Sequence, residues 1–183
     1  MNKLISRLRQ FNLSELYRHL LDLSEKNALR RSPSEIMRQY NQNKFVSPAQ
    51  TPQKTFLFFD KLAYDCLPSF FTDVELSPVA PFAINSTVSH LSQKNVLTTI
   101  RDLEVVADPT TYLSLMCSQL RRSGIEKVDL ATSHRILRSQ NFEGIPGFIP
   151  HFRLFALASA QKDPGSTRFE LTKFQEHLEF YLD

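Results

Sequence analysis

Glycine is scarce in this sequence: the chain of 183 residues contains four. Phosphate-binding loops of the Walker and dinucleotide types place several glycines in one short turn, because only a backbone without side chains can approach a pyrophosphate closely. No stretch of the sequence has that composition. The scarcity therefore excludes both kinds of Gly-rich nucleotide loop.

Cysteine is rarer still. Cys66 and Cys117 are the two cysteines, and each lies inside an apolar helical pattern without a paired spacing. Because disulfide frameworks need paired cysteines and an oxidising compartment, we expect two reduced, buried thiols and a cytoplasmic protein. The five histidines also lack the spacing of metal ligands, both with each other and with the cysteines. We therefore predict no metal site.

Long hydrophobic runs are absent as well. No segment approaches the roughly 20 apolar residues that span a bilayer, so we expect no membrane contact. The opening stretch "MNKLISRLRQF" is basic and free of acids. A transit peptide is one interpretation of that composition, and the lack of a Ser-rich continuation argues against it.

Charge is distributed unevenly along the chain. Residues 1–55 hold ten Lys and Arg against four Asp and Glu, a balance of +6, whereas residues 56–183 hold twelve against fifteen, a balance of −3. We therefore divide the chain into a basic extension with its connector, residues 1–50, and a mildly acidic body, residues 51–183. The excess charge of the extension fits either a solvated helical surface or attraction to an anionic partner such as RNA.

The extension is predicted to be helical. Asn12 stands three residues before Glu15, and Ser32 stands three residues before Glu35, which is the spacing of a capping box at the start of a helix. The following stretch "NQNKFVSPAQTPQ" breaks the helical pattern with its prolines and amides. We expect it to connect the extension to the body.

The body begins with a helix after Pro52 and then changes period. Residues 70–78 alternate between apolar and polar side chains, as a strand does. One or two further strands are expected within residues 95–108, long strands at 127–140 and 150–160, and helices at 108–124 and 171–183. Strands joined by hairpins, with helices kept apart from them, indicate an α+β domain with an antiparallel β-sheet flanked by helices.

The order of these segments resembles the catalytic core of class II aminoacyl-tRNA synthetases. The stretch "FLFFDKLAYDCLPSFFTDVELSP" resembles the family's first motif, a long helix and then a strand that ends near a proline at the dimer interface, with Pro78 in that place. "LRSQ" and "HFRLF", on either side of a loop, resemble the second motif. The departure is Gln140, where the family usually has glutamate. The resemblance covers residues 54–160.

The resemblance implies a role for each residue of the second motif. Arg138 would hold the α-phosphate of ATP as the catalytic residue, His151 would hold the terminal phosphates, and Phe155 would stack on the adenine. A fixed guanidinium suits the first task, because its planar, charge-assisted donors match a phosphate where negative charge develops. Gln140 completes the implied cofactor-binding set, and ATP and Mg²⁺ are the implied cofactors. The competing interpretation is that Arg138 pairs with an acid and Phe155 belongs to the core.

A second similarity lies upstream. "IRDLEVVADPTTYLSLM" resembles the segment of the histidyl-tRNA synthetase branch that binds the amino group of the substrate. Asp108 and Thr110 fall near that place, and Arg101 and Glu104 flank it, so these four are the candidate substrate-binding residues. The alternative is that Asp108 simply caps the helix that follows.

The family's third motif, a Gly-rich strand and helix with an ATP-binding arginine, has no counterpart after residue 160, where Arg168 is the remaining arginine. Either residues 51–183 are the N-terminal part of a larger core, or another polypeptide completes the site, or the activity has been lost. Two functions therefore stay open. One is an ATP-binding ligase that activates an amino acid or a related carboxylate, and the other is a non-catalytic synthetase paralogue acting as a binding or regulatory subunit. The resemblance also implies a homodimer through residues 51–78.

Overall fold

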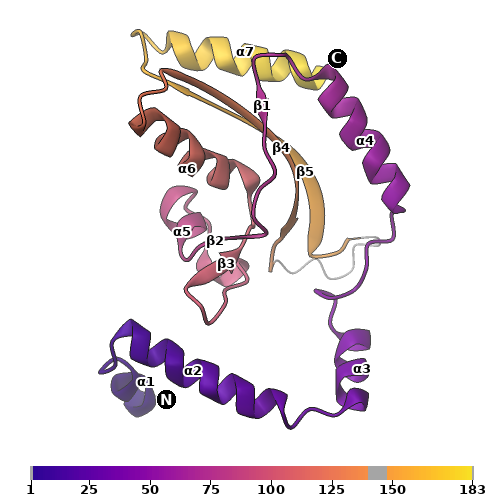
Figure 1. Cartoon of the computed structure of the whole chain (residues 1–183), viewed down its shortest axis with the longest axis vertical. Helices are drawn as coiled ribbons and strands as arrows, with labels where there is room; N and C mark the ends of the chain where they lie inside the picture. The colour runs from indigo at the N-terminus through magenta and orange to yellow at the C-terminus, as the bar shows by residue number, and fades with distance from the viewer. Residues whose placement is uncertain (1, 140–147, 183) are drawn as a thin grey trace.

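A computed structural model of the chain describes residues 2–139 and 148–182. Its elements follow in the order α1–α2–α3–α4–β1–β2–α5–η1–β3–α6–β4–β5–α7. Figure 1 shows the first three helices as an arm below a body in which helices flank a curved sheet. Within the described residues, no helix has both the length and the apolar character needed to cross a membrane.

The arm is built from local interactions. Its helices are α1 (Asn2–Leu8), α2 (Leu13–Ala28) and α3 (Pro33–Gln42). Both predicted capping boxes are confirmed: Asn12 and Glu15, and likewise Ser32 and Glu35, each accept a hydrogen bond from the other's backbone N–H. Neither α2 nor α3 has a buried residue. The arm is therefore held together by caps rather than by a core of its own.

The main sheet has three strands in the order β1–β4–β5. Their bounds are Thr72–Asp73, Lys127–Leu137 and His151–Gln161. β4 and β5 form a long antiparallel hairpin, whereas β1 runs parallel to β4. The prediction of a purely antiparallel sheet is therefore wrong, and the sheet is mixed. The reason lies in the connection: the chain between β1 and β4 makes a long crossover through further elements, which parallel neighbours require.

Strand β1 is shorter than the alternating pattern over residues 70–78 predicts. The backbone N–H of Val74 still donates to the carbonyl of Ala131 at 2.9 Å, but the chain then turns away from β4. It forms a two-stranded antiparallel sheet of β2 (Val79–Pro81) and β3 (Leu103–Val105). Pro78 lies at this change of partner, where its lack of an N–H costs no ladder hydrogen bond.

Helices cover both faces of the β4–β5 hairpin (Figure 1). The remaining helical elements are α4 (Gln53–Cys66), α5 (Ile84–Val88), η1 (Gln93–Asn95), α6 (Pro109–Arg122) and α7 (Arg168–Leu182). Leu113 and Cys117 of α6 pack with Val128 and Leu130 of β4. Phe180 of α7 and, from α4, the partly buried Ala63 pack instead around Ala131 and Leu157.

These contacts define two faces of the hairpin. Successive side chains of a strand point to opposite faces, and the register pairs Leu137 with His151. The even-numbered residues of β4 and β5 therefore lie on the side of α6, here the α6 face. The odd-numbered residues lie on the side of α4 and α7, here the α4–α7 face.

Candidate functional site

Arg138 lies directly after β4, on the α6 face. Its Nη2 is 3.1 Å from Oδ2 of Asp108, and its Nε donates to the carbonyl of Ala107 at 2.8 Å. The guanidinium carbon lies 5.6 Å from the ring centre of Phe152. Both charged side chains of the pair are about three-quarters buried. Arg138 is thus held by one acid, one carbonyl and one aromatic ring.

Asp108 serves two neighbours at once. Its Oδ1 accepts hydrogen bonds from the backbone N–H of Thr110 at 2.9 Å and from the Thr110 hydroxyl at 2.7 Å, which caps α6. Its Oδ2 faces Arg138. The structure therefore brings together three of the predicted site residues, Arg138, Asp108 and Thr110. Their polar side-chain atoms bond to one another.

Glu104 and Arg101 are not part of this group. Glu104 is fully buried and accepts hydrogen bonds from the backbone of Ala83 and Asn85 and from the side-chain amides of Asn85 and Gln93. Burial alone raises the pKa of Glu104, but these hydrogen bonds outweigh it and hold the pKa below its ordinary value. Its carboxylate fixes the start of α5. Arg101 is exposed in the turn before β3.

His151 lies on the α4–α7 face and uses both ring nitrogens. Nη1 of Arg135 is 2.9 Å from its Nδ1, and its Nε2 is 2.6 Å from the carbonyl of Ser47. Because a guanidinium only donates, Nδ1 accepts and Nε2 carries the proton that is donated to Ser47. His151 therefore joins the hairpin to the connector.

Phe155 lies on the α4–α7 face, where it is partly buried. Its ring stacks on Phe180 with centres 5.3 Å apart and meets Tyr64 edge to face at 5.1 Å. The Tyr181 hydroxyl donates to its carbonyl at 3.0 Å. On this face, Phe155 is separated from Arg138 by the sheet itself.

The predicted nucleotide site is thus divided between the two faces of the hairpin. Arg138 follows β4 in the even-numbered set, whereas His151 and Phe155 belong to the odd-numbered set. Gln140 lies outside the described residues. The aromatic ring that does accompany Arg138 is Phe152, which the spacing of the second motif did not single out. Its proximity depends on the hairpin register, and the sequence alone did not specify that register.

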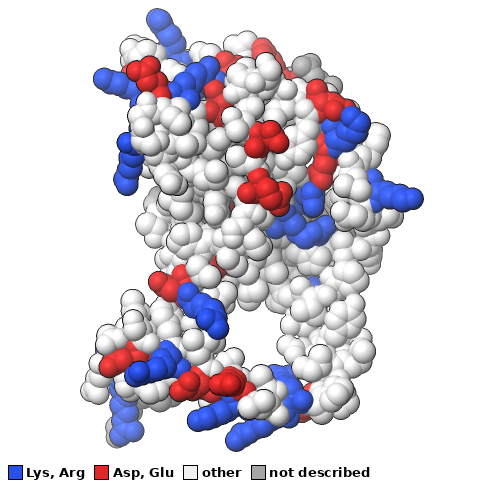
Figure 2. All heavy atoms as spheres, in the orientation of Figure 1, with Lys and Arg blue, Asp and Glu red and all other residues white. Residues whose placement is uncertain are grey.

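The arm carries a second group of polar residues. A pocket of about 740 Å³ lies along α3 and the start of the connector. It is lined by three cations, one acid, three side-chain amides and one aromatic ring: Arg31, Arg38, Lys44, Glu35, Gln39, Gln42, Asn43 and Phe45. The acid is already engaged, because the backbone and hydroxyl of Ser32 donate to it and hold its pKa low. Figure 2 shows basic side chains gathered along the arm.

Buried ionisable groups also lie beneath α7. Lys173 is almost fully buried, and its Nζ lies 2.8 Å from Asp129 and 2.5 Å from Glu176. Burial lowers the pKa of Lys173, but these two carboxylates outweigh it and raise the pKa above its usual range. Burial and the Lys173 charge lower the pKa of His177. Within the described residues, no group of three or more His, Cys, Asp and Glu could hold a metal ion.

Comparison with known proteins gives similarity of structure only. No family model matches the sequence, and no curated protein matches it. A pyrrolysyl-tRNA synthetase structure, PylSc of Desulfitobacterium hafniense, has a TM-score of 0.57 at 13% identity, covering 97% of this chain and 55% of that one. A second pyrrolysyl-tRNA synthetase structure from the same organism has a TM-score of 0.55 at 12% identity, covering 81% of this chain and 51% of that one.

A histidyl-tRNA synthetase from Nostoc sp. is also similar, with a TM-score of 0.53 at 13% identity, covering 75% of this chain and 34% of that one. The predicted class II synthetase-like core is therefore confirmed as a fold. The chain spans about half the length of the pyrrolysyl structures and a third of the histidyl one. At this identity the similarity concerns the fold alone.

Proposed function

We propose that the protein is a non-catalytic synthetase-like binding protein whose basic arm contacts RNA. The observation that carries the first part is the division of the predicted nucleotide site. Arg138 is neutralised by Asp108 on the α6 face, while His151 and Phe155 are engaged on the α4–α7 face. A bound nucleotide cannot contact both sets at once, because the hairpin lies between them.

The pocket along α3 supports the second part of the proposal. Arg31, Arg38 and Lys44 offer positive charge to phosphates, and the amide side chains offer donors and acceptors to base edges. Phe45 gives an aromatic surface on which a base can stack. Glu35 is held by its capping box and keeps its charge, so the three cations and one acid of the pocket leave a net charge of +2.

The test is the binding of a short single-stranded RNA, followed by fluorescence anisotropy at increasing salt. Contact with about three phosphates gives a slope of log K against log salt near −2, since each contributes about −0.7. Arg38→Gln should weaken binding and reduce that slope by about 0.7. Lys162→Gln, which removes an exposed lysine of the body, is the matched control and should change neither. Binding that is indifferent to Arg38 and to salt would refute the RNA proposal.

A second candidate function is ATP binding on the α6 face. The observation that favours it is the position of Phe152 beside Arg138, which places an aromatic ring and a guanidinium on one side of the sheet. Arg138 would exchange Asp108 for a phosphate, and the freed Asp108 carboxylate has the oxygen donors that suit Mg²⁺. Phe152→Ala and Arg138→Ala should then both abolish stabilisation by ATP.

The homodimer through residues 51–78 also stays a proposal. Leu57 and Phe58 on the outer side of α4 are more than half exposed, and apolar surface of this kind is typical of interfaces. Sedimentation at tens of micromolar, on the order set by interface energetics, should give a dimer that Phe58→Glu dissociates. A monomer at that concentration would contradict the proposal.

A further inference from the structure

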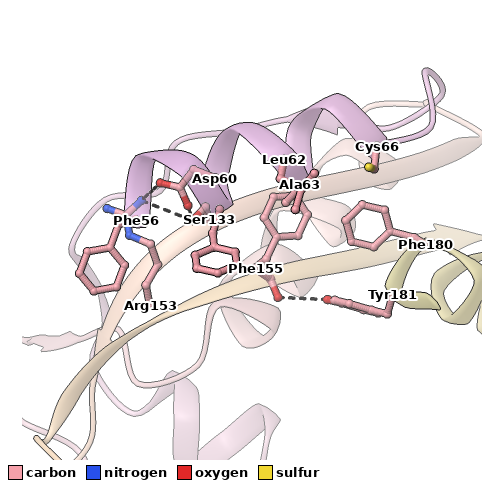
Figure 3. Close-up of a pocket in the computed structure, with 11 residues that line it drawn as sticks. Phe56, Asp60, Leu62, Ala63, Cys66, Ser133, Arg153, Phe155, Phe180 and Tyr181 are labelled. Carbon is pink, nitrogen blue, oxygen red and sulfur yellow. Dashed lines mark hydrogen bonds and ion pairs between the residues drawn. The ribbon is translucent and has the colours of Figure 1, made fainter. Parts of the chain in front are cut away.

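A groove runs between α4, the hairpin and α7 on the α4–α7 face. Its volume is about 550 Å³, within the usual range for small-molecule sites. Figure 3 shows that Phe56, Asp60, Ser133 and Arg153 lie at one end, and Cys66, Phe180 and Tyr181 lie toward the other. The groove is therefore polar at one end and apolar along the rest of its length.

The polar end has an incomplete set of hydrogen bonds. Nη1 of Arg153 forms an ion pair with Asp60, which also accepts from the Ser133 hydroxyl at 2.5 Å. The Nε of Arg153 is buried, and it finds no hydrogen-bond partner among the described residues. A buried N–H without an acceptor is costly. The guanidinium thus has a donor that a ligand oxygen could satisfy.

Two arginines stand side by side at the polar end. Arg135 is directly opposite Arg153 in the hairpin register, and like charges so placed are destabilising. Both guanidinium groups lie near the ring of Phe56, at 4.9 and 5.9 Å from its centre. Within the described part of the chain, Asp60 is the one carboxylate in an ion pair with either arginine, and that pair is with Arg153. Glu75 lines the adjoining pocket with both arginines but forms no ion pair with either.

We infer that this groove binds an amphipathic monocarboxylate, with the carboxylate beside Arg153 and the apolar chain along Phe155, Phe180 and Cys66. A carboxylate oxygen gives the buried Nε its acceptor, and its negative charge adds to that of Asp60 beside the two arginines. The aromatic lining then removes the apolar chain from water. The site lies on the opposite side of the sheet from Arg138, so the inference is independent of the proposed function.

The experiment measures thermal unfolding and calorimetric titration with decanoate, below its micelle-forming concentration. Decylammonium, with the same chain and the opposite charge, is the control for charge, and acetate is the control for the apolar chain. We expect one decanoate per chain, a raised melting temperature, and no comparable effect from either control.

Two pairs of variants locate the site. Arg135→Gln leaves the Asp60–Arg153 pair intact and should weaken decanoate binding about three- to tenfold, whereas Arg135→Lys keeps the charge and should retain most of the affinity. At the apolar end, Cys66→Trp should shorten the groove and abolish binding, while Leu171→Trp, at an exposed side chain of α7 outside the groove, should leave it unchanged. The expectation of a buried Cys66 is wrong, because this thiol is exposed, so both substitutions are compatible with folding.

Three results would overturn the inference. Equal binding of decanoate and decylammonium would show that charge plays no part. Several molecules bound per chain would show unspecific association with apolar surface. Absence of decanoate binding, together with a dimer that Leu62→Asp dissociates, would show that a second copy of the chain fills the groove.

Discussion

The two faces of the β4–β5 hairpin differ in what their side chains are free to do. On the α6 face, Leu113, Ile136 and Val106 are almost completely buried, and Arg138 at its end is neutralised by an acid. On the α4–α7 face, Arg153 pairs with Asp60 beside an open groove, and Arg135 stands opposite Arg153 in the register. A sequence motif along one strand therefore does not show which residues form one site until the register assigns each residue to a face of the hairpin.

The largest effect on stability should come from the α6 face. Leu113 is fully buried in the core between α6 and the sheet, so Leu113→Ala should lower the free energy of unfolding by about 2–5 kcal/mol through lost burial and a residual cavity. Leu171→Ala, at a side chain of α7 that is 65% exposed, is the matched control and should change it by less than about 0.5 kcal/mol. Urea unfolding measures both, and equal losses would contradict the assignment of the core.

Arg138→Ala should have the next largest effect. It removes the ion pair with Asp108 and the hydrogen bond to Ala107, and we expect a loss of about 1–2 kcal/mol, reduced by the partial exposure of both side chains. Arg138→Lys retains the charge but not the forked geometry, and should lose less. If Arg138→Ala unfolds at the same urea concentration as the wild type, the pair has no structural role.

The α4–α7 face should make stability depend on pH. Burial lowers the pKa of His177 below its ordinary value of 6.5, so the unfolded chain takes up the proton at higher pH than the folded one. The contribution of His177 to the free energy of unfolding is therefore fully present above pH 6.5. It is lost as the pH drops from there through the lowered pKa. His134, which lies on the α6 face, acts in the same direction, since burial lowers its pKa as well.

His177→Gln isolates one part of this dependence. Glutamine can still donate to the Ser159 hydroxyl, which lies 2.9 Å from Nε2 of His177, but it does not titrate. Urea unfolding between pH 5 and 8, a range that brackets the ordinary histidine pKa, should show a shallower fall for this variant. An unchanged pH profile would mean that His177 stays exposed to solvent.

The smallest effect is expected at the arm. The Tyr17 hydroxyl donates to Oδ1 of Asp102 at 2.9 Å in an exposed contact between α2 and the body. Exposed contacts of this kind contribute little, so Tyr17→Phe should unfold at nearly the same urea concentration as the wild type. A clearly lowered midpoint would show that the arm is an integral part of the folded body rather than an appendage.

Local signals in the sequence were sufficient for much of the fold. The caps at Asn12, Ser32 and Asp108 lie where the sequence predicts them, because each depends on residues within one helical turn. The helix predicted from residue 171 starts earlier, because α7 begins at Arg168. The Arg168 backbone N–H faces the carbonyl of Gly165 at 3.4 Å, and no short sequence pattern indicates this start.

The site was less predictable than the fold for a physical reason. A shift of one residue in hairpin register moves every side chain to the other face, and the register depends on a loop whose length the family motif does not fix. The pairing of Leu137 with His151 places Phe152 rather than Phe155 beside Arg138. The juxtaposition of Arg135 and Arg153 could not be predicted either, because it arises only when the two strands pair.

The central claim is that the residues of the predicted nucleotide site are divided between the two faces of the hairpin. Its most direct test is the change in the free energy of unfolding caused by ATP and Mg²⁺, measured for the wild type and for Phe155→Ala. If Arg138 and Phe155 lie on opposite faces, no stabilisation by ATP depends on Phe155, and the shift is the same in both proteins. A stabilisation of about 2.7 kcal/mol at 100 times the dissociation constant, abolished equally by Phe155→Ala and Arg138→Ala, would contradict the account.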